Sequence, residues 1–190
     1  TATNDAKGYA YIQNAAVGSA SERARISINS YGYSFANASV SSAFSASIVS
    51  AGVNHMYSNA NGTFDAFIDT AYAIYATSVD IKTHYLVSSQ AVVTDGVVDF
   101  SIVKVNNNVA TADTKSSSSA YIKGNGSLNT TSAVNVVSRG NATSRAYYRS
   151  PAAAVSAVKV AYNEITASLH STQNSYIDFA SLTTNGNAVT

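Results

Sequence analysis

The sequence predicts an all-β protein: a sandwich or barrel-like fold, immunoglobulin-like or pilin-like, with a detachable N-terminal strand. Segments rich in Val, Ile, Tyr and Thr, in which apolar and polar residues alternate, recur about every ten residues, which is typical of sandwiches and barrels. Clusters of Asn, Gly and Ser separate these segments, and none of them is clearly helical. A chain of 190 residues, 46% of them hydrophobic, has the size and composition of one globular domain.

The first strand is expected between Gly8 and Gly18, an uncharged stretch with two Tyr, one Ile and one Val and a glycine at each end. A polar leader precedes it and a small-residue spacer follows it. We therefore expect residues 1–18 to form a leader and donor strand, and residues 19–190 to form a single β domain. Such a strand can pair with its own sheet or add to the sheet of a neighbouring copy, and the sequence leaves both open. The candidate donor-strand residues are Tyr9, Tyr11, Ile12, Ala15 and Val17.

The two faces of this strand differ in apolar area. Because side chains alternate along a strand, Tyr9, Tyr11 and Val17 share one face, and Ile12 lies on the other. Burial of a large apolar side chain contributes about 1.5–3 kcal/mol, so the face with more rings should be buried. We expect this face to point toward the acceptor's core, and Ile12 to lie under a loop or toward solvent.

Further strands are expected along the body of the chain. They fall at residues 22–35, 40–49, 63–76, 79–87, 90–94, 97–105, 120–123, 128–137, 142–150, 152–169 and 175–182, with polar loops at 51–62 and 110–119. The Asp95-Gly96 pair between two apolar runs predicts a two-residue β-hairpin, and Gly124-Asn125-Gly126 predicts a second one. The segments share a texture of Ala, Ser, Thr, Val and Tyr, and no exact internal repeat is found.

The composition excludes several classes of function. Only 11% of the residues are charged, against about 25% in a typical domain, and the net charge of +1 gives no field that would attract nucleic acid. There are no cysteines, hence no disulfides or thiol chemistry, and no apolar run reaches the roughly 18 residues of a membrane span. The chain begins at Thr1 without a methionine, which fits a processed secretory product, so we expect an extracellular or cell-surface location.

The search for catalytic groups yields only weak patterns, and we expect no enzyme activity, no metal and no cofactor. Ser101 and Lys104, and again Ser156 and Lys159, match the Ser-x-x-Lys spacing of some acyl-enzymes, but the companion motifs are absent and Ser is abundant. The three histidines, His55, His84 and His170, are far apart. Asp65 and Asp69 are interpreted as solvated carboxylates of a strand face rather than as a cation site.

Two residue types bear on the surface. Asn-x-Ser/Thr sequons occur at five positions, Asn37, Asn61, Asn125, Asn129 and Asn141. Of these, Asn61, Asn125 and Asn141 are expected in exposed turns, where a glycan acceptor must lie, Asn129 is the next candidate, and Asn37 is the weakest. The 13 tyrosines are spread along the alternating segments, which favours strand packing over a sugar-binding platform.

Taken with the uncharged leading strand 8–18 and the sequons, this texture resembles the thread-type surface filaments of thermoacidophilic archaea. The resemblance implies a structural subunit of an extracellular, N-glycosylated filament, a homopolymer in which the leading strand completes the sandwich of the next subunit. It also implies a role in adhesion or cell–cell contact. The alternative is a monomeric secreted β-sandwich, a carbohydrate-binding or adhesin module, whose first strand pairs in its own sheet.

Overall fold

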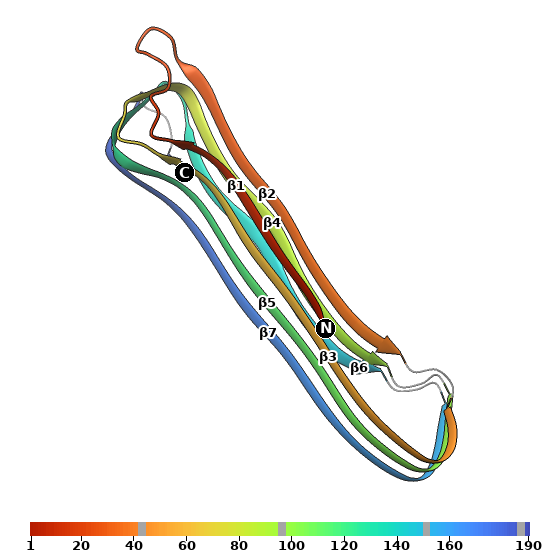
Figure 1. The fold of residues 1–190 in the computed structure, drawn as a ribbon. Helices are drawn as coiled ribbons and strands as arrows, with labels where there is room; N and C mark the ends of the chain where they lie inside the picture. The colour runs from red at the N-terminus through yellow and green to blue at the C-terminus, as the bar shows by residue number, and fades with distance from the viewer. Residues whose placement is uncertain (42–44, 95–97, 150–152, 186–188) are drawn as a thin grey trace.

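The computed structural model describes residues 1–41, 45–94, 98–149, 153–185 and 189–190, and it confirms the all-β class. The strands are β1 (Ala2–Gln13), β2 (Ala24–Ser41), β3 (Ser45–Asp69), β4 (Ile74–Thr94), β5 (Val98–Thr130), β6 (Val134–Arg149) and β7 (Ala153–Thr184). Figure 1 shows that these strands run side by side along the length of a flattened, elongated molecule.

Every described pairing between strands is parallel. β1, β3, β5 and β7 lie next to one another in that order, and so do β2, β4 and β6. We call the first group the odd sheet and the second the even sheet. The two join where Ile74–Ala76 pairs with Leu128–Thr130, so the seven strands form one sheet that wraps around the core.

The chain therefore winds as a parallel β-solenoid. One strand of the odd sheet and the next strand of the even sheet make one coil, and each residue lies beside the residue one coil later. Asn54 and Asn108 are such a pair, 54 residues apart, as are Asn108 and Asn163, 55 residues apart. A coil of about 55 residues is a structural repeat that the sequence analysis did not find.

The predicted hairpins are wrong. β4 and β5 flank the Asp95-Gly96 pair, which itself lies outside the described residues, but they pair only at the distant 74–76 and 128–130 segments and in parallel. Gly124-Asn125-Gly126 lies inside β5, where it shifts the register with β7. The strands pair one coil later rather than folding back, which differs from an immunoglobulin-like sandwich, whose neighbouring strands are antiparallel.

The predicted loops at 51–62 and 110–119 are also wrong, because they lie within β3 and β5. The Asn and Ser residues of these segments are typical of loops. In the structure every second side chain points into the core, and polar ones among them form hydrogen bonds with residues of the even sheet. Ser118 Oγ lies 2.7 Å from Ser138 Oγ of the even sheet, and Ser89 Oγ lies 2.7 Å from Thr114 Oγ1. A buried hydroxyl costs little free energy when it has such a partner.

The core between the sheets is aliphatic near the β3–β4 and β5–β6 turns and small or polar elsewhere. The aliphatic cluster includes Ile68, Ile81, Ile122 and Leu128. Two large rings, Phe64 and Tyr85, stack in the middle at 5.8 Å between centroids. The remaining inward positions are mostly Ala, Ser, Thr, Asn and Gly, which allow the two sheets to pack closely.

Candidate interaction surfaces

Four aromatic rings form a ladder on the outer face of the odd sheet. Tyr11, Phe67, Tyr121 and Tyr176 occupy equivalent positions of the four strands. Successive centroids lie 5.0, 4.8 and 5.1 Å apart, and the interplanar angles do not exceed 9°. The two inner rings are covered on both faces by their neighbours.

Charged side chains flank the ring ladder. Lys123 Nζ lies 3.3 Å from Asp69 Oδ2 and 5.4 Å from the centre of the Tyr121 ring. The hydrogen bond to Asp69, together with the charge of that carboxylate, raises the pKa of Lys123. Burial raises the pKa of Tyr121, and the positive charge of Lys123 opposes this shift.

Asp65 lies on the same outer face, two residues before Phe67 on β3. Burial raises the pKa of its carboxyl group, and the backbone N–H of Ser119, which donates to Oδ1 at 3.1 Å, acts in the opposite direction. The residues in the described ranges contain no group of three or more His, Asp or Glu arranged to hold a metal ion.

Inside the solenoid, Asn54, Asn108 and Asn163 form an amide ladder. Asn54 Nδ2 donates to Asn108 Oδ1, and Asn108 Nδ2 donates to Asn163 Oδ1, both at 2.9 Å. Asn108 is 2% exposed, so its amide has both a donor and an acceptor partner where water does not reach. The ladder runs along the solenoid axis and ties three successive coils together.

The outer face of the even sheet has a different character. Tyr31, Tyr33 and Phe35 are consecutive outward residues of β2, each more than half exposed. Beside them, Lys82, His84 and Arg139 line a groove of about 250 Å³ together with Tyr31. Further basic residues, Arg145 and Arg149, follow on β6.

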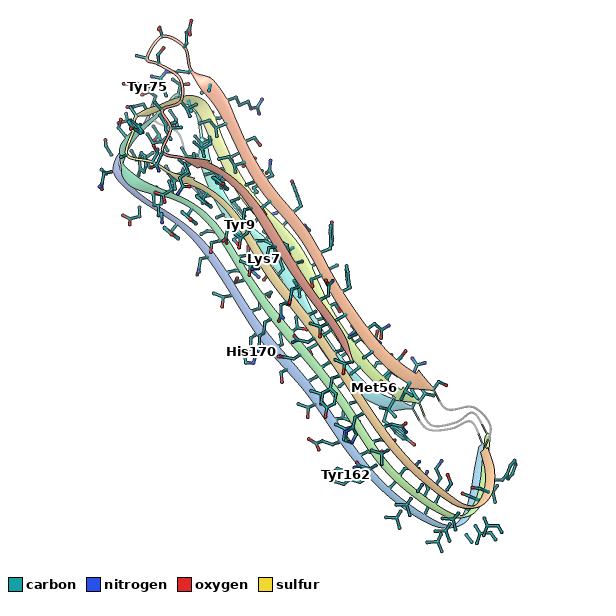
Figure 2. The ribbon with its side chains drawn as sticks, viewed as in Figure 1. Lys7, Tyr9, Met56, Tyr75, Tyr162 and His170 are labelled. Carbon is teal, nitrogen blue, oxygen red and sulfur yellow. The ribbon has the colours of Figure 1, made fainter. Side chains whose placement is uncertain are left out.

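The predicted donor-strand residues lie within their own subunit. β1 pairs with β3 along its whole length, and Val17 bridges to Ile74. Ala15 accepts a hydrogen bond from the Thr70 hydroxyl at 3.1 Å. The buried face is the reverse of the predicted one: Ile12 packs against the aliphatic core, whereas Tyr9 and Tyr11 are more than half exposed, Tyr9 beside Lys7 in Figure 2.

This outcome has a simple physical reason. A flat sheet of stacked coils buries side chains against the even sheet, and only the small and aliphatic residues of β1 fit there: Ala10 and Ile12 pack against the core. The tyrosines reach neighbours along the solenoid axis instead, since Tyr11 stacks on Phe67. Ring area was therefore a poor guide to the buried face.

The sequons are not placed as predicted. Asn61 and Asn141 lie in strands rather than turns, and only Asn125 falls at an irregularity, the shifted register of β5. Asn37, Asn125 and Asn141 are exposed, whereas Asn61 and Asn129 are half-buried. Asn61 donates to Asp5 Oδ1 and Asn129 donates to Ser127, so these two amides are engaged within the protein.

The two Ser-x-x-Lys matches occupy one row of the solenoid. Ser101 pairs with Ser156, and Lys104 pairs with Lys159 one coil later. The three histidines lie on β3, β4 and β7, and His170 projects from β7 in Figure 2. In the described part of the chain there is also no helix of the length and apolarity that crossing a membrane requires.

No family model, no curated protein and no solved structure matches this chain. The signal that sequence reasoning missed is the coil repeat. Ala10-Tyr11-Ile12, Ala66-Phe67-Ile68, Ala120-Tyr121-Ile122 and Ser175-Tyr176-Ile177 recur once per coil. An alignment of the chain with itself at an offset of 54 to 56 residues would have found it.

Proposed function

We propose that this chain is a structural rod segment of an extracellular filament. The observation that supports it most directly is the coil-by-coil repetition of the side-chain ladders, in particular the four-ring ladder from Tyr11 to Tyr176. Each ladder runs along the solenoid axis, so a further coil would extend it through the same type of side-chain contact. Such quasi-one-dimensional proteins are stabilised by contacts between neighbouring repeats and can grow in length.

The edges of the coil stack favour extension at both ends. An open groove of about 630 Å³ at the β1–β2 end is lined by Ile12, Val17, Ile26 and Ile28. At the opposite end of the stack, Ile165 and Leu169 of β7 are each 49% exposed, although their neighbours one coil earlier, Ala110 and Thr114, are buried. Unpaired strand edges with apolar side chains are templates for further strands.

We propose addition at these edges in place of the strand insertion that the sequence suggested. β1 already pairs with β3 throughout and Ile12 is in contact with its own core, so freeing β1 would cost both sets of interactions. Addition of a strand from another copy to the outer edge of β1 needs no such rearrangement. The proposed filament therefore grows by stacking coils, and its role in adhesion or cell–cell contact follows from the exposed faces of the rod.

The carbohydrate-binding alternative is less well supported on the odd sheet. Stacking of a sugar requires an open ring face, and the rings of Phe67 and Tyr121 are covered on both faces by the rest of the ladder. The edges of these rings, rather than their faces, line the surface.

Electron microscopy and fibre diffraction of native material test this proposal. In a solenoid the strands lie across the rod, so we expect thin rods and a reflection of about 4.7–4.9 Å along their axis. Dispersed particles, or rods whose strand spacing lies perpendicular to the axis, as in a chain of antiparallel sandwich subunits, would contradict it.

A further inference from the structure

The charges of the solenoid are divided unequally between its two outer faces. Among the described residues, the outer face of the odd sheet has six acidic side chains, Asp5, Asp65, Asp69, Asp113, Glu164 and Asp178, and three basic ones, Lys7, Lys115 and Lys123. The outer face of the even sheet has five basic side chains, Arg25, Lys82, Arg139, Arg145 and Arg149, and one acidic one, Asp80. The faces therefore differ in sign although the whole chain is nearly neutral.

The opposite charges also recur at one constant offset along the strands. Ser144 Oγ donates across the core to the carbonyl of Ala112 at 2.9 Å, whereas Ser118 meets Ser138, so β5 and β6 run in opposite directions. Arg145 and Asp113 therefore project from opposite faces with an offset of two residues, roughly 7 Å, along the strands. Ser118 and Ser138 meet across the core in the same way. Ser119, which holds Asp65, and Arg139 are therefore offset by two residues in the same direction as Asp113 and Arg145.

We propose that the rods associate laterally with further copies of this chain, the even sheet of one copy packing on the odd sheet of the next. A copy displaced perpendicular to the sheets and shifted by roughly 7 Å along the strands, without rotation, brings its Arg145 over Asp113 and its Arg139 over Asp65. Both faces belong to the same solenoid and share one strand spacing, so the rows stay in step along the axis. The proposal rests on the rod function and adds the partner and the surface.

The area of the contact is sufficient for a specific interface. The 16 residues of β6 extend about 50 Å, and the three strands of the even sheet span about 14 Å. The product, roughly 700 Å² per copy, approaches the roughly 800 Å² per partner of a standard interface. The exposed rings of Tyr31, Tyr33 and Phe35 supply the apolar part.

Because the contact joins two different faces, it does not close on itself. Each added copy presents a new basic face on one side and a new acidic face on the other, so the assembly grows as layers. Rods that lengthen by coil addition would then also associate side by side into bundles.

Charge reversal at one matched row tests the inference. In Asp113→Arg both faces of the row are basic, and in Arg145→Asp both are acidic, so each variant alone should raise the concentration needed for half-association about tenfold. An equimolar mixture of the two variants restores opposite charges at every contact, and so does the double variant Asp113→Arg/Arg145→Asp. Both should recover the association of the unmodified chain.

Light scattering and sedimentation velocity at low and high salt provide the readout, with electron microscopy of the same samples. Glu22→Arg, in the exposed β1–β2 turn, changes the net charge as Asp113→Arg does but lies off both faces, and it should leave association unchanged. Lateral association that persists in both single variants, or that the mixture fails to restore, overturns the inference. So does a chain that binds an acidic polysaccharide through its even face but does not associate with itself. Single rods without bundles would overturn only the lateral contact, whereas the absence of rods would contradict the proposed function.

Discussion

The rings of Phe67 and Tyr121 lie 4.8 Å apart, centroid to centroid, with their planes 4° from parallel. They belong to strands of successive coils and face solvent, so their stacking couples neighbouring coils from outside the core. A stacked aromatic pair contributes about 0.5–1.5 kcal/mol of stability beyond the burial of its surface area.

Tyr121→Ser should lower the free energy of unfolding by about 1–3 kcal/mol, because the ring stacks on Phe67 on one side and on Tyr176 on the other. Urea denaturation measures the change. Tyr162→Ser is the matched control on β7: that ring is 60% exposed, and its hydroxyl donates to Glu164 of the same strand. Equal small effects of the two substitutions would show that the ladder does not stabilise the coil stack.

Gly32→Ala should destabilise the fold by more than about 3 kcal/mol, at the upper end of overpacking effects. A Cβ atom at Gly32 would fall inside the ring of Phe64, which lies against this strand from β3. Combining Gly32→Ala with Phe64→Leu should recover part of the loss. Gly52→Ala is the control, because its nearest neighbour is a flexible amide oxygen of Asn106 at 3.2 Å. Thermal unfolding at equal protein concentration compares the four proteins, and a silent Gly32→Ala would contradict the packing of the two sheets.

The sequence predicts the strand content of this fold well and its pairing poorly. Alternation of apolar and polar residues depends on one strand at a time, so 24–41 and 74–94 are recognisable as strands from their own residues. Pairing in a solenoid depends on residues about 55 positions away. The Asp95-Gly96 signal is local, and it cannot compete with the stacking of whole coils.

Rows of like residues, one from each coil, are the part of the surface that could have been predicted from the sequence. A Ser-rich chain produces Ser-x-x-Lys matches by chance, yet Lys104 and Lys159 occupy one row because the pattern repeats with the coil. The opposite charges of the two faces could not be predicted in the same way. They emerge only when the winding assigns Asp113 to one sheet and Arg145 to the other.

Asn108→Ala should cost about 2 kcal/mol of stability, since it leaves the Asn54 donor and the Asn163 acceptor without their partner. Asn107→Ala, at the adjacent outward position of the same strand, should change stability by no more than about 0.5 kcal/mol. Denaturant midpoints of the two variants, measured side by side, check the amide ladder. A larger loss for Asn107→Ala would contradict it.

Asp65 should make the stability depend on pH. Burial raises the pKa of its carboxyl above the unfolded value of 3.8, so in the interval above 3.8 the folded chain binds more protons than the unfolded chain. Stability from this group therefore falls as pH rises through that interval. Asp65→Asn removes the effect, so the difference in unfolding free energy between variant and wild type should shift in favour of the variant from pH 3 to pH 7. A pH-independent difference would contradict the raised pKa.

Glycans, if the chain is exported to a glycosylating compartment as proposed, should follow exposure rather than turn position. Asn125 is exposed and should carry sugar, whereas the amides of Asn61 and Asn129 bond within the protein. Asn37 and Asn141 are also exposed, but they lie on the outer face of the even sheet near Arg145 and Arg139, so they should be bare in laterally packed rods. A glycan on Asn61 would remove its bond to Asp5 and place a bulky group in the row shared with Lys115 and His170, on the face that we propose for lateral packing. Peptide mass spectrometry of native material distinguishes the two patterns. Sugar on Asn61 with a bare Asn125 would contradict the exposure argument, and sugar on Asn37 or Asn141 in bundled rods would contradict the packing face.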